Sequence, residues 1–450
     1  MALTDESNRL GEEAVFPLLF KLSTPSIIGM LIQALYNVID SIYIGHLSKE
    51  ALSALSLVFP IQLILIAVAV GTGIGTSSLI SRLLGEEKEE KVNIVAQNII
   101  FITIFYGIIA GLIGYFASED IISFFTNDPL LIDLGEAYIE IILLGSLALF
   151  FPIIADNILR GEGNTFIPMI TVIIGAVLNI ALDPFLIFGI GIFPKLGIRG
   201  AAYATIFSRL VSGIFIGIFL FRNYRQFELD IKSFKFDFEV IKEVYQVGLP
   251  SMIMQLLSSF MILGVNKIVA SYNVTAIAVV GVYHRLQTFI LMPVFGLGQG
   301  YMPIVGYNYG HDNLDRMKKA IRYGLIAGFL FTTIGGMFFQ IFPGQLVSLF
   351  NDDPSLVQIG VTALKRISFA FPIMGLSVIA SITFQAIGKG IPSLVLSFLR
   401  QIVLLLPIMY LLGRTYGLDA AWFAFPISEL LVSILTILWL AITLKKIYPE

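Results

Sequence analysis

Long apolar stretches alternate with short polar ones along the whole chain. In windows of about 20 residues, which cross roughly 30 Å of hydrocarbon as a helix, they form twelve segments. Their approximate bounds are 17–44, 51–81, 93–117, 130–158, 165–190, 198–222, 240–271, 275–305, 318–342, 356–386, 391–413 and 419–444. The pattern predicts an all-α polytopic membrane protein with twelve transmembrane helices, which tilt or bend at prolines such as Pro152 where a segment is long.

Composition agrees with this pattern. The 450 residues are 57% hydrophobic and 13% charged, with a mean hydropathy of +0.90, which is too apolar for an ordinary soluble domain. The net charge of −3 gives no broad basic field for nucleic acid, so the expected surroundings are a lipid bilayer. The chain has no cysteine, and residues 1–16 lack the basic region and cleavage site of a signal peptide. The first apolar segment is therefore expected to remain as a helix.

Lysine and arginine residues in the connections fall unequally on the two sides of the membrane. One side carries most of them, in clusters near 82–91, 222–242, 316–322 and 445–446. The other side holds Lys49, Lys195, Arg199 and Arg414. The positive-inside rule then predicts a multi-pass protein of the cell (inner or plasma) membrane with both termini cytoplasmic.

Short motifs repeat at an offset of half the chain. FFTNDP at 124–129 recurs as LFNDDP at 349–354, and LGIRGAAYA at 196–204 recurs as YGLDAAWFA at 416–424. GTGIG at 71–75 likewise matches GLGQG at 296–300. The matches stay in order, which predicts two pseudo-symmetric lobes of six helices each. Because both lobes insert with the same topology, they form a parallel repeat about an axis along the membrane normal.

The repeat divides the chain into an N-terminal lobe, 1–225, and a C-terminal lobe, 226–450, joined by a basic cytoplasmic linker at about 222–247. Two such lobes suggest alternating access to a small-molecule cavity between or within them. We expect the protein to act as a monomer and to need no cofactor besides a coupling ion.

Two acidic residues interrupt the apolar segments of the N-terminal lobe. Asp40 lies in YNVIDSIYIG, residues 36–45, and Asp183 lies in LNIALDP, residues 178–184. A carboxylate inside a membrane carries a desolvation cost of several kcal/mol, so its presence indicates a functional site by default. Both segments run from inside to outside, and a rise of about 1.5 Å per residue puts both acids in the outer half of the membrane. We expect them to share one pocket.

Polar neighbours lie within one or two helical turns of these acids: Gln33, Tyr36 and Asn37 before Asp40, and Asn179 before Asp183. A low dielectric and a second carboxylate nearby both favour the neutral acid, which suits proton transport. The same oxygens are suitable ligands for sodium, so the coupling ion stays open between the two.

A purely structural explanation stands beside this one. A single Asp near a helix end can cap the helix or lie at the membrane interface, and Asp183-Pro184 can begin a turn before Gly189. The pair on parallel helices argues more strongly for function than either acid alone.

Four motifs carry a family resemblance: YNVIDSIYIG, LNIALDP, ILRGEGN at 158–164 and GAAYAT at 200–205. Set in six plus six segments, they resemble the multidrug and toxic compound extrusion (MATE) family, above all its DinF-like bacterial and archaeal branch. The resemblance implies that the aspartates matching Asp40 and Asp183 couple cation entry to drug efflux. It also implies partners for them at Tyr36, Asn179 and Thr205.

The same resemblance implies a hinge at Pro25, where the first helix bends. The implied function is cation-coupled export of amphipathic, often cationic, organic compounds. If sodium is the coupling ion, its implied ligands are Asp40, Asn179, Asp183 and Thr205.

The C-terminal lobe departs from the symmetry. The counterpart of Asp40 falls at Val265 or Asn266, and that of Asp183 falls near Leu406. In another branch of the family, acidic residues of the C-terminal lobe carry the ion. Because they are absent at these counterpart positions, the coupling site is predicted in the N-terminal lobe.

Other charges lie within the apolar segments. Asp156 and Arg160 are expected to form a local salt bridge across one helical turn. Arg209 and Glu429 occupy equivalent repeat positions near the midplane. We hypothesise that they contact each other across the two lobes. The alternative is that each has a partner in its own lobe. His284 is expected to have a structural role.

Other functional classes fit less well. The sequence has three His, no Cys, no Walker-type loop and no HExxH motif. It therefore lacks the recognisable motifs of phosphate or zinc enzymes. A flippase for lipid-linked precursors, which shares the fold of this superfamily, would need several cavity arginines, and Arg285 and Arg400 keep this alternative open. A channel would need a selectivity filter, which no segment resembles.

Overall fold

The computed structural model describes residues 9–223 and 236–447. Within these ranges all regular secondary structure is helical. Eleven helices are long and apolar enough to cross a membrane, and counting one bent pair as a single span gives twelve. The predicted all-α membrane fold with twelve spans is confirmed.

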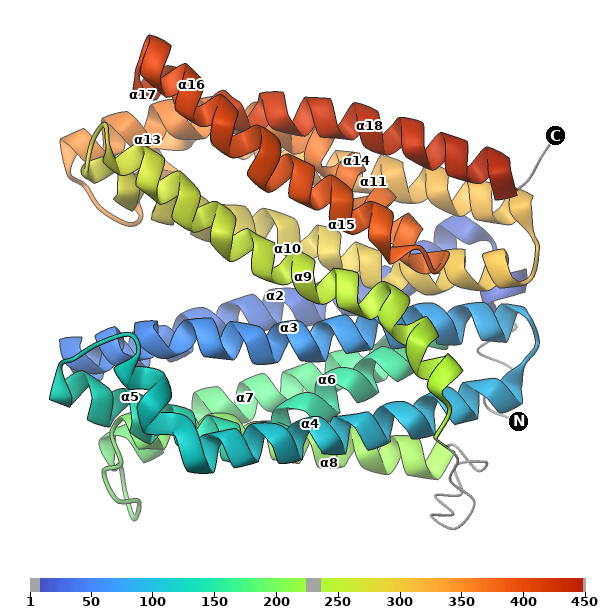
Figure 1. Cartoon of the computed structure of the whole chain (residues 1–450), viewed down its shortest axis with the longest axis horizontal. Helices are drawn as coiled ribbons and strands as arrows, with labels where there is room; N and C mark the ends of the chain where they lie inside the picture. Colours follow the sequence, from blue (N-terminus) through green and yellow to red (C-terminus); the bar gives the residue numbers. More distant parts are fainter. Residues whose placement is uncertain (1–8, 224–235, 448–450) are drawn as a thin grey trace.

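Two helical bundles lie side by side, one from each half of the chain (Figure 1). The first contains α2 (Val15–Leu47), α3 (Lys49–Gly85), α4 (Glu89–Ser123), α5 (Pro129–Leu144), α6 (Ser146–Gly161), α7 (Phe166–Phe188) and α8 (Ile198–Asn223). The second contains α9 (Phe238–Ala270), α10 (Thr275–Gly310), α11 (Leu314–Ile341), α12 (Pro343–Ser348), α13 (Pro354–Ile367), α14 (Phe371–Ala386), α15 (Gly390–Phe398), α16 (Leu406–Tyr416), α17 (Leu418–Ala421) and α18 (Ala424–Ile447). The predicted lobe boundary at 225/226 and residues 224–235 of the linker lie outside the described residues, and the end of the predicted linker, 238–247, belongs to α9.

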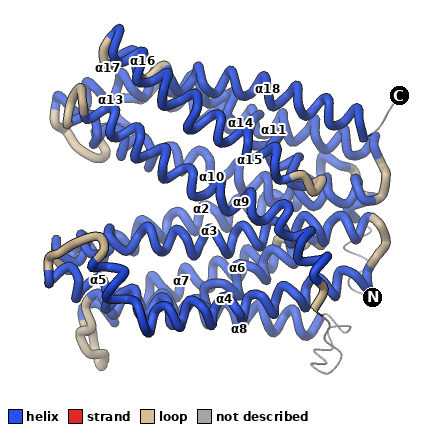
Figure 2. The backbone as a smooth tube through the Cα atoms, in the orientation of Figure 1, coloured by secondary structure: helices blue, strands red, loops and turns tan. Residues whose placement is uncertain are grey.

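Two spans of the second bundle change their helical type partway. A 3-10 turn at Ser368–Ala370 joins α13 to α14, and a π-helix at Leu399–Leu405 joins α15 to α16. Loops among the described residues are confined to the two ends of the bundles (Figure 2). The predicted even number of crossings therefore returns the start of α2 and the end of α18 to one end of the molecule (Figure 1).

The fourth span is broken. Its two pieces, α5 and α6, meet at Gly145 with a bend of 51°. A Cβ atom at Gly145 would come within 2.6 Å of the Ile206 side chain of α8, so only glycine allows this close approach. The bend expected at Pro152 is therefore found at Gly145, and Pro152 lies inside α6.

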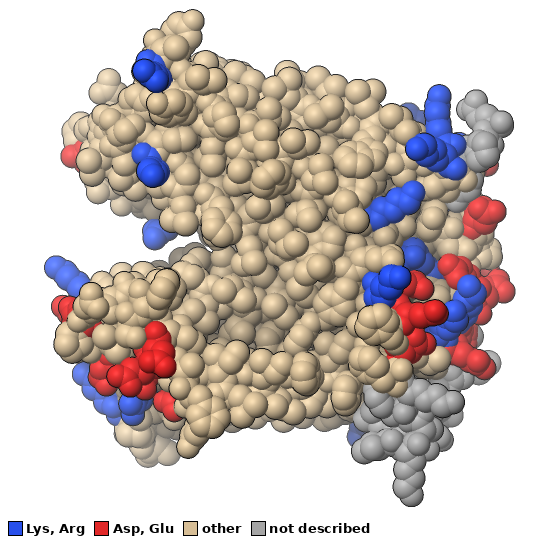
Figure 3. Space-filling model, in the orientation of Figure 1, with Lys and Arg blue, Asp and Glu red and all other residues tan. Residues whose placement is uncertain are grey.

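The surface matches a membrane environment. In Figure 3, charged side chains gather toward the two ends of the molecule, and the middle of this face is almost free of them. Large apolar side chains are exposed along the outer helices, as on α4, where Phe105, Ile108 and Leu112 are each more than half exposed. Such exposure is unfavourable in water and favourable against lipid.

The two lobes contact each other through α2 and α3 of the first and α9 and α10 of the second. The repeated glycine motifs lie at this contact. A Cβ at Gly71 of α3 would come within 2.8 Å of the Gly248 carbonyl oxygen of α9, and one at Gly300 of α10 within 2.6 Å of the Leu22 backbone of α2. Small residues that let helix backbones approach are the usual packing device inside membranes. The GTGIG and GLGQG repeats therefore build two equivalent contacts between the lobes.

At the end of the molecule where α2 begins, polar groups add to this contact. His311 Nδ1 lies 3.1 Å from the Gly85 carbonyl oxygen, and Asn308 Nδ2 donates to the Leu10 carbonyl at 3.2 Å. Arg316 donates to the carbonyls of Leu10 and Glu13. At the opposite end the lobes separate, and Figure 3 shows a cleft between them that opens there.

Candidate coupling site in the N-terminal lobe

Asp40 and Asp183 both lie inside long helices. Asp40 is in α2, which continues to Leu47, and Asp183 is in α7, which continues to Phe188. The left-handed turn after α7 is made by Gly189, with φ of 74°. Neither acid caps a helix or begins a turn, so these structural explanations do not account for them.

The two carboxyl groups lie against each other at hydrogen-bonding range. Asp183 is fully buried and Asp40 is partly buried. Oδ1 of each residue has no hydrogen-bond donor among the described residues. Two carboxyl groups can share such a position only if a proton or another cation lies between them, because two bare carboxylates repel each other. The two acids that the sequence was expected to bring together thus lie next to each other.

Asn179 and Thr205 hold Asp183 from one side. With the Asn179 amide nitrogen toward Asp183, Nδ2 donates to Asp183 Oδ2 at 3.0 Å and the amide oxygen accepts from the Thr205 backbone N–H at 3.2 Å. In the opposite orientation Nδ2 donates to Thr205 Oγ1 at 3.3 Å. The first orientation satisfies both ends of the amide, so it ties α7 to α8 beside the carboxyl pair.

Tyr36 joins the same network. Its hydroxyl interacts with the Thr205 side chain, and its ring lies near both acids, one turn before Asp40 on α2. Gln33 and Asn37 form their own pair on this helix, in which Gln33 Nε2 donates to Asn37 Oδ1 at 3.3 Å. Pro25 lies farther along α2 toward the end where the lobes meet.

Two residues that the sequence did not single out also face the acid pair. Tyr138 of α5 is 2% exposed and interacts electrostatically with Asp40, Tyr36 and Asp183. Gln62 of α3 donates to its hydroxyl at 3.1 Å. The broken fourth span brings Tyr138 to this position. Neither residue shows helical spacing to an acid in the sequence, so no signal there could have identified them.

The polar network extends toward the other end of the lobe through Arg209. This residue of α8 interacts with Tyr36 on one side and with Asp156 of α6 on the other. The predicted local salt bridge of Asp156 with Arg160 is not formed in the described part of the chain, where Asp156 Oδ1 and Arg160 Nε have no hydrogen-bond partner. Asp156 is instead within electrostatic range of both arginines.

Glu429 has its partner in its own lobe. Its Oε2 is 3.4 Å from Nη1 of Arg400, in the π-helix that joins α15 to α16. The hypothesised contact between Arg209 and Glu429 across the lobes is therefore wrong, because Glu429 pairs with Arg400 of its own bundle and Arg209 interacts with Tyr36 and Asp156 of its own. His284 is partly buried and interacts with Gln287 on the same helix.

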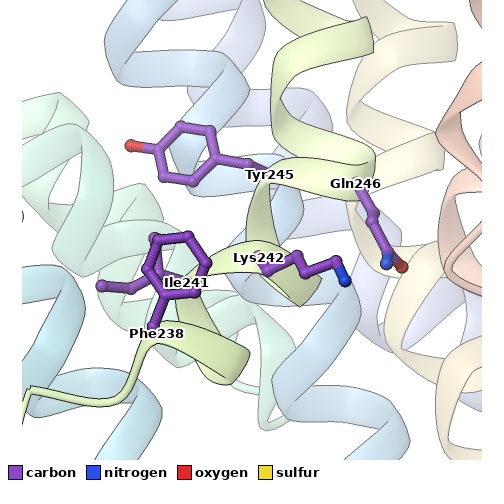
Figure 4. A pocket seen from close by; sticks show the side chains of 5 residues that line it. All are labelled: Phe238, Ile241, Lys242, Tyr245 and Gln246. Atoms are coloured by element: carbon purple, nitrogen blue, oxygen red, sulfur yellow. The ribbon is translucent and has the colours of Figure 1, made fainter.

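A separate pocket lies at the beginning of α9, far along the chain from the acid pair. It is lined by Phe238, Ile241, Lys242, Tyr245 and Gln246 (Figure 4). Tyr245 points away from Lys242 and Gln246 (Figure 4), and its hydroxyl contacts that of Tyr106 of α4. The pocket adjoins the start of the C-terminal lobe and contains none of the predicted coupling residues.

Comparisons with known proteins agree with this arrangement. The family model MatE matches the chain twice, over residues 25–185 and 250–411, once in each lobe. The chain is 28% identical to the FAD transporter of Shewanella oneidensis over 419 residues, which covers 92% of each protein. It is 28% identical to the multidrug export protein MepA of Staphylococcus aureus over 426 residues, covering 94% of this chain and 93% of that protein.

Solved structures give the same result. An outward-facing multidrug resistance MATE transporter of the MOP superfamily superposes with a TM-score of 0.92 at 27% identity, covering 98% of both chains. Two family matches, one per bundle, also account for the internal repeat of the sequence. The chain therefore belongs to the MatE family of membrane transporters.

Proposed function

We propose that this protein is a cation-coupled antiporter that exports amphipathic, often cationic, organic compounds by alternating access. The observation that carries the proposal is the carboxyl pair of Asp40 and Asp183, which lie against each other with an oxygen each that lacks a donor among the described residues. Such a pair binds either a cation from the medium or a cationic substrate, and the two compete for it. Membership of a transporter family, and not an enzyme family, supports transport as the activity.

The proton is our first candidate for the coupling ion. One proton shared between the two carboxyl groups removes the repulsion between them without any further ligand. Sodium is the second candidate, because Thr205 supplies a neutral hydroxyl oxygen, and the Asn179 amide in its opposite orientation would turn its oxygen toward Asp183.

The proposed cycle begins with the cleft open to the outside, which follows if both termini are cytoplasmic. The acid pair then takes up its cation, α2 bends near Pro25, and the bound compound loses its site and leaves outward. The empty, cation-free protein returns to the inward-facing form and binds the next molecule. We place the protein as a monomer in the cell membrane.

The test is transport of ethidium, a fluorescent organic cation, into or out of proteoliposomes under an imposed proton gradient or an imposed sodium gradient. Wild type is compared with Asp40→Asn and Asp183→Asn, and with Asp352→Asn as a control at an exposed acid outside the site. One gradient is expected to drive transport by wild type and the control, and neither gradient by the two site variants.

If both site variants transport ethidium at the wild-type rate, the carboxyl pair has no coupling role. If neither gradient drives wild-type transport, the protein is not a secondary antiporter for this substrate class. The gradient that does drive transport identifies the coupling ion.

A further inference from the structure

The C-terminal lobe holds a second buried polar cluster. It joins Arg400 of the π-helix and Glu429 of α18 with Tyr283 of α10, which interacts electrostatically with both. Glu429 is 3% exposed and Tyr283 is 1% exposed. Nothing in the proposed coupling mechanism uses these residues.

The cluster has unused hydrogen-bonding capacity. Among the described residues, Glu429 Oε1 has no hydrogen-bond partner, and the Tyr283 hydroxyl, which interacts with the Gln287 side chain, has no partner at full hydrogen-bonding geometry. The guanidinium of Arg400 has five N–H groups. Among the described residues, one of them, on Nη1, has a partner, through its long contact to Glu429. Buried polar groups are normally satisfied, and inside a membrane no bulk water does this. A ligand with acceptor atoms would accept from the unpaired N–H groups of Arg400 and from the Tyr283 hydroxyl.

The cluster lies in the spans of the C-terminal lobe that correspond to α3, α7 and α8 of the N-terminal lobe. Gln287 of α10 is the counterpart of Gln62, since GLGQG at 296–300 matches GTGIG at 71–75. Arg400 falls in the span that corresponds to α7 and lies six residues, or about two turns, before Leu406, the counterpart of Asp183. The span that carries a carboxyl group in the N-terminal lobe thus carries a guanidinium at a neighbouring position in the C-terminal lobe.

Local backbone and depth both fit a ligand site. A π-helix is rare, and such segments occur frequently at functional sites because the wider turn changes the direction of its side chains. Arg400 is ten residues into the 27-residue span Gly390–Tyr416, which is about 15 Å along a helix and near the middle of the membrane. A phospholipid headgroup does not normally lie at that depth, whereas a solute in the cleft between the lobes can.

We propose that Arg400, with the Tyr283 hydroxyl, forms an anion subsite of the C-terminal lobe that binds a carboxylate or phosphate group of an amphipathic solute. The anionic group competes with Glu429 for the guanidinium of Arg400. The transporter then accepts compounds that carry an acidic group, in addition to the organic cations that suit the acid pair of the N-terminal lobe. This inference rests on the proposed export function, which it extends to a further substrate class.

Equilibrium binding to the purified full-length protein in phosphatidylcholine nanodiscs tests the subsite without any gradient. Three fluorescent probes separate the chemistry: FAD carries a diphosphate, riboflavin has the same flavin ring without phosphate, and ethidium is a cation. Wild type is expected to bind FAD about tenfold more tightly than riboflavin, which corresponds to one charge-assisted contact. Equal affinities for the two flavins would overturn the proposal.

Arg400→Gln is expected to weaken FAD binding about tenfold and to leave riboflavin and ethidium within about twofold. Glu429→Gln removes the competing carboxylate, so FAD binding should tighten about threefold or more. Arg414→Gln, at an exposed arginine of the same span, is the matched control. A merely structural ion pair would give the opposite pattern, in which both site variants weaken all three probes alike.

Two further comparisons keep the interpretation unambiguous. The double variant Arg400→Gln/Glu429→Gln removes both charges of the pair, so neither is left unpaired. It should fold and bind ethidium, and it should bind FAD and riboflavin with equal affinity. In nanodiscs of phosphatidylglycerol, a loss of FAD binding would show that a lipid headgroup occupies the subsite, which contradicts a solute site. Suppose that ethidium transport proves independent of any ion gradient while Arg400→Gln still weakens FAD binding. That result would refute the proposed export mechanism and leave the anion subsite supported.

Discussion

The carboxyl group of Asp183 faces that of Asp40 across two helices, α7 and α2, that lie far apart in the sequence. Asp183 Oδ2 accepts from Asn179 Nδ2 at 3.0 Å, and Asp183 Oδ1 has no donor among the described residues. One oxygen of Asp183 is thus fixed by its neighbour, and the other is left for a proton or another cation.

Ethidium affinity should depend on the concentration of the coupling cation. Each cation bound at the pair removes negative charge that attracts ethidium, so the ethidium Kd should rise about tenfold when the pair is saturated. For a proton, the rise occurs as the pH falls; for sodium, it occurs as sodium is added at constant pH. Fluorescence titration of the purified protein measures this shift.

The double variant Asp40→Asn/Asp183→Asn should give an ethidium Kd that no longer changes with pH or sodium, because no carboxyl group remains to bind either ion. Asp352→Asn should behave as wild type. A wild-type Kd that is constant from pH 5 to pH 8 and from zero to saturating sodium would refute the competition.

Thr205→Val removes one hydroxyl from the network while keeping the shape of the side chain. The variant leaves Tyr36 without its Thr205 contact, so the turnover of ethidium transport should fall about tenfold, as expected for one lost hydrogen bond in a buried site. Thr333→Val is the control, because Thr333 is partly exposed and its hydroxyl donates to the Phe329 carbonyl of its own helix, α11. Unchanged turnover in Thr205→Val would show that this hydroxyl does not support the site.

Gly300→Ala should weaken the contact between the lobes. The added Cβ would lie within 2.6 Å of the Leu22 backbone, which cannot move aside as a side chain can. Overpacking of this kind costs about 1–3 kcal/mol, so the thermal midpoint of the purified protein should fall by several degrees and transport should decline. In Gly281→Ala on the same helix, the new Cβ has no atom within 4 Å, so the thermal midpoint and transport should stay unchanged. Equal effects of the two substitutions would contradict the backbone contact.

A cysteine pair can report on separation of the lobes, because the natural chain has no cysteine. A Cβ at Gly306 of α10 would lie 3.0 Å from Ser81 Cβ of α3, roughly 0.5 Å less than the shortest separation that a disulfide spans, so a small outward shift of the two helices brings the pair into range. Oxidation of Ser81→Cys/Gly306→Cys should cross-link the lobes and stop transport, and a reductant should restore it. Full transport by the cross-linked protein would mean that the lobes do not separate at this end.

The apolar pattern was sufficient to predict the number of spans, because membrane helices need a fixed length of apolar sequence, and the repeated motifs predicted the two lobes. It also predicted that Asp40 and Asp183 meet, since both stand at similar depth in the same lobe. It could not predict Tyr138 or the partner of Glu429. In a chain that is apolar on every helix face, periodicity does not show which faces pack together, and a bend at Gly145 changes direction without any charge or proline to mark it.

The glycine contacts between the lobes have a consequence for the speed of the transport cycle. Where Gly71 meets Gly248 and Gly300 meets Leu22, main chain lies on main chain, with the Met252 side chain packed beside Gly71. At these backbone contacts few side chains must change rotamer before the lobes part, so lost dispersion contact and the polar links at one end contribute much of the activation barrier. The joint can open and re-form many times in the same register, which a reversible carrier needs and an interlocked core would resist.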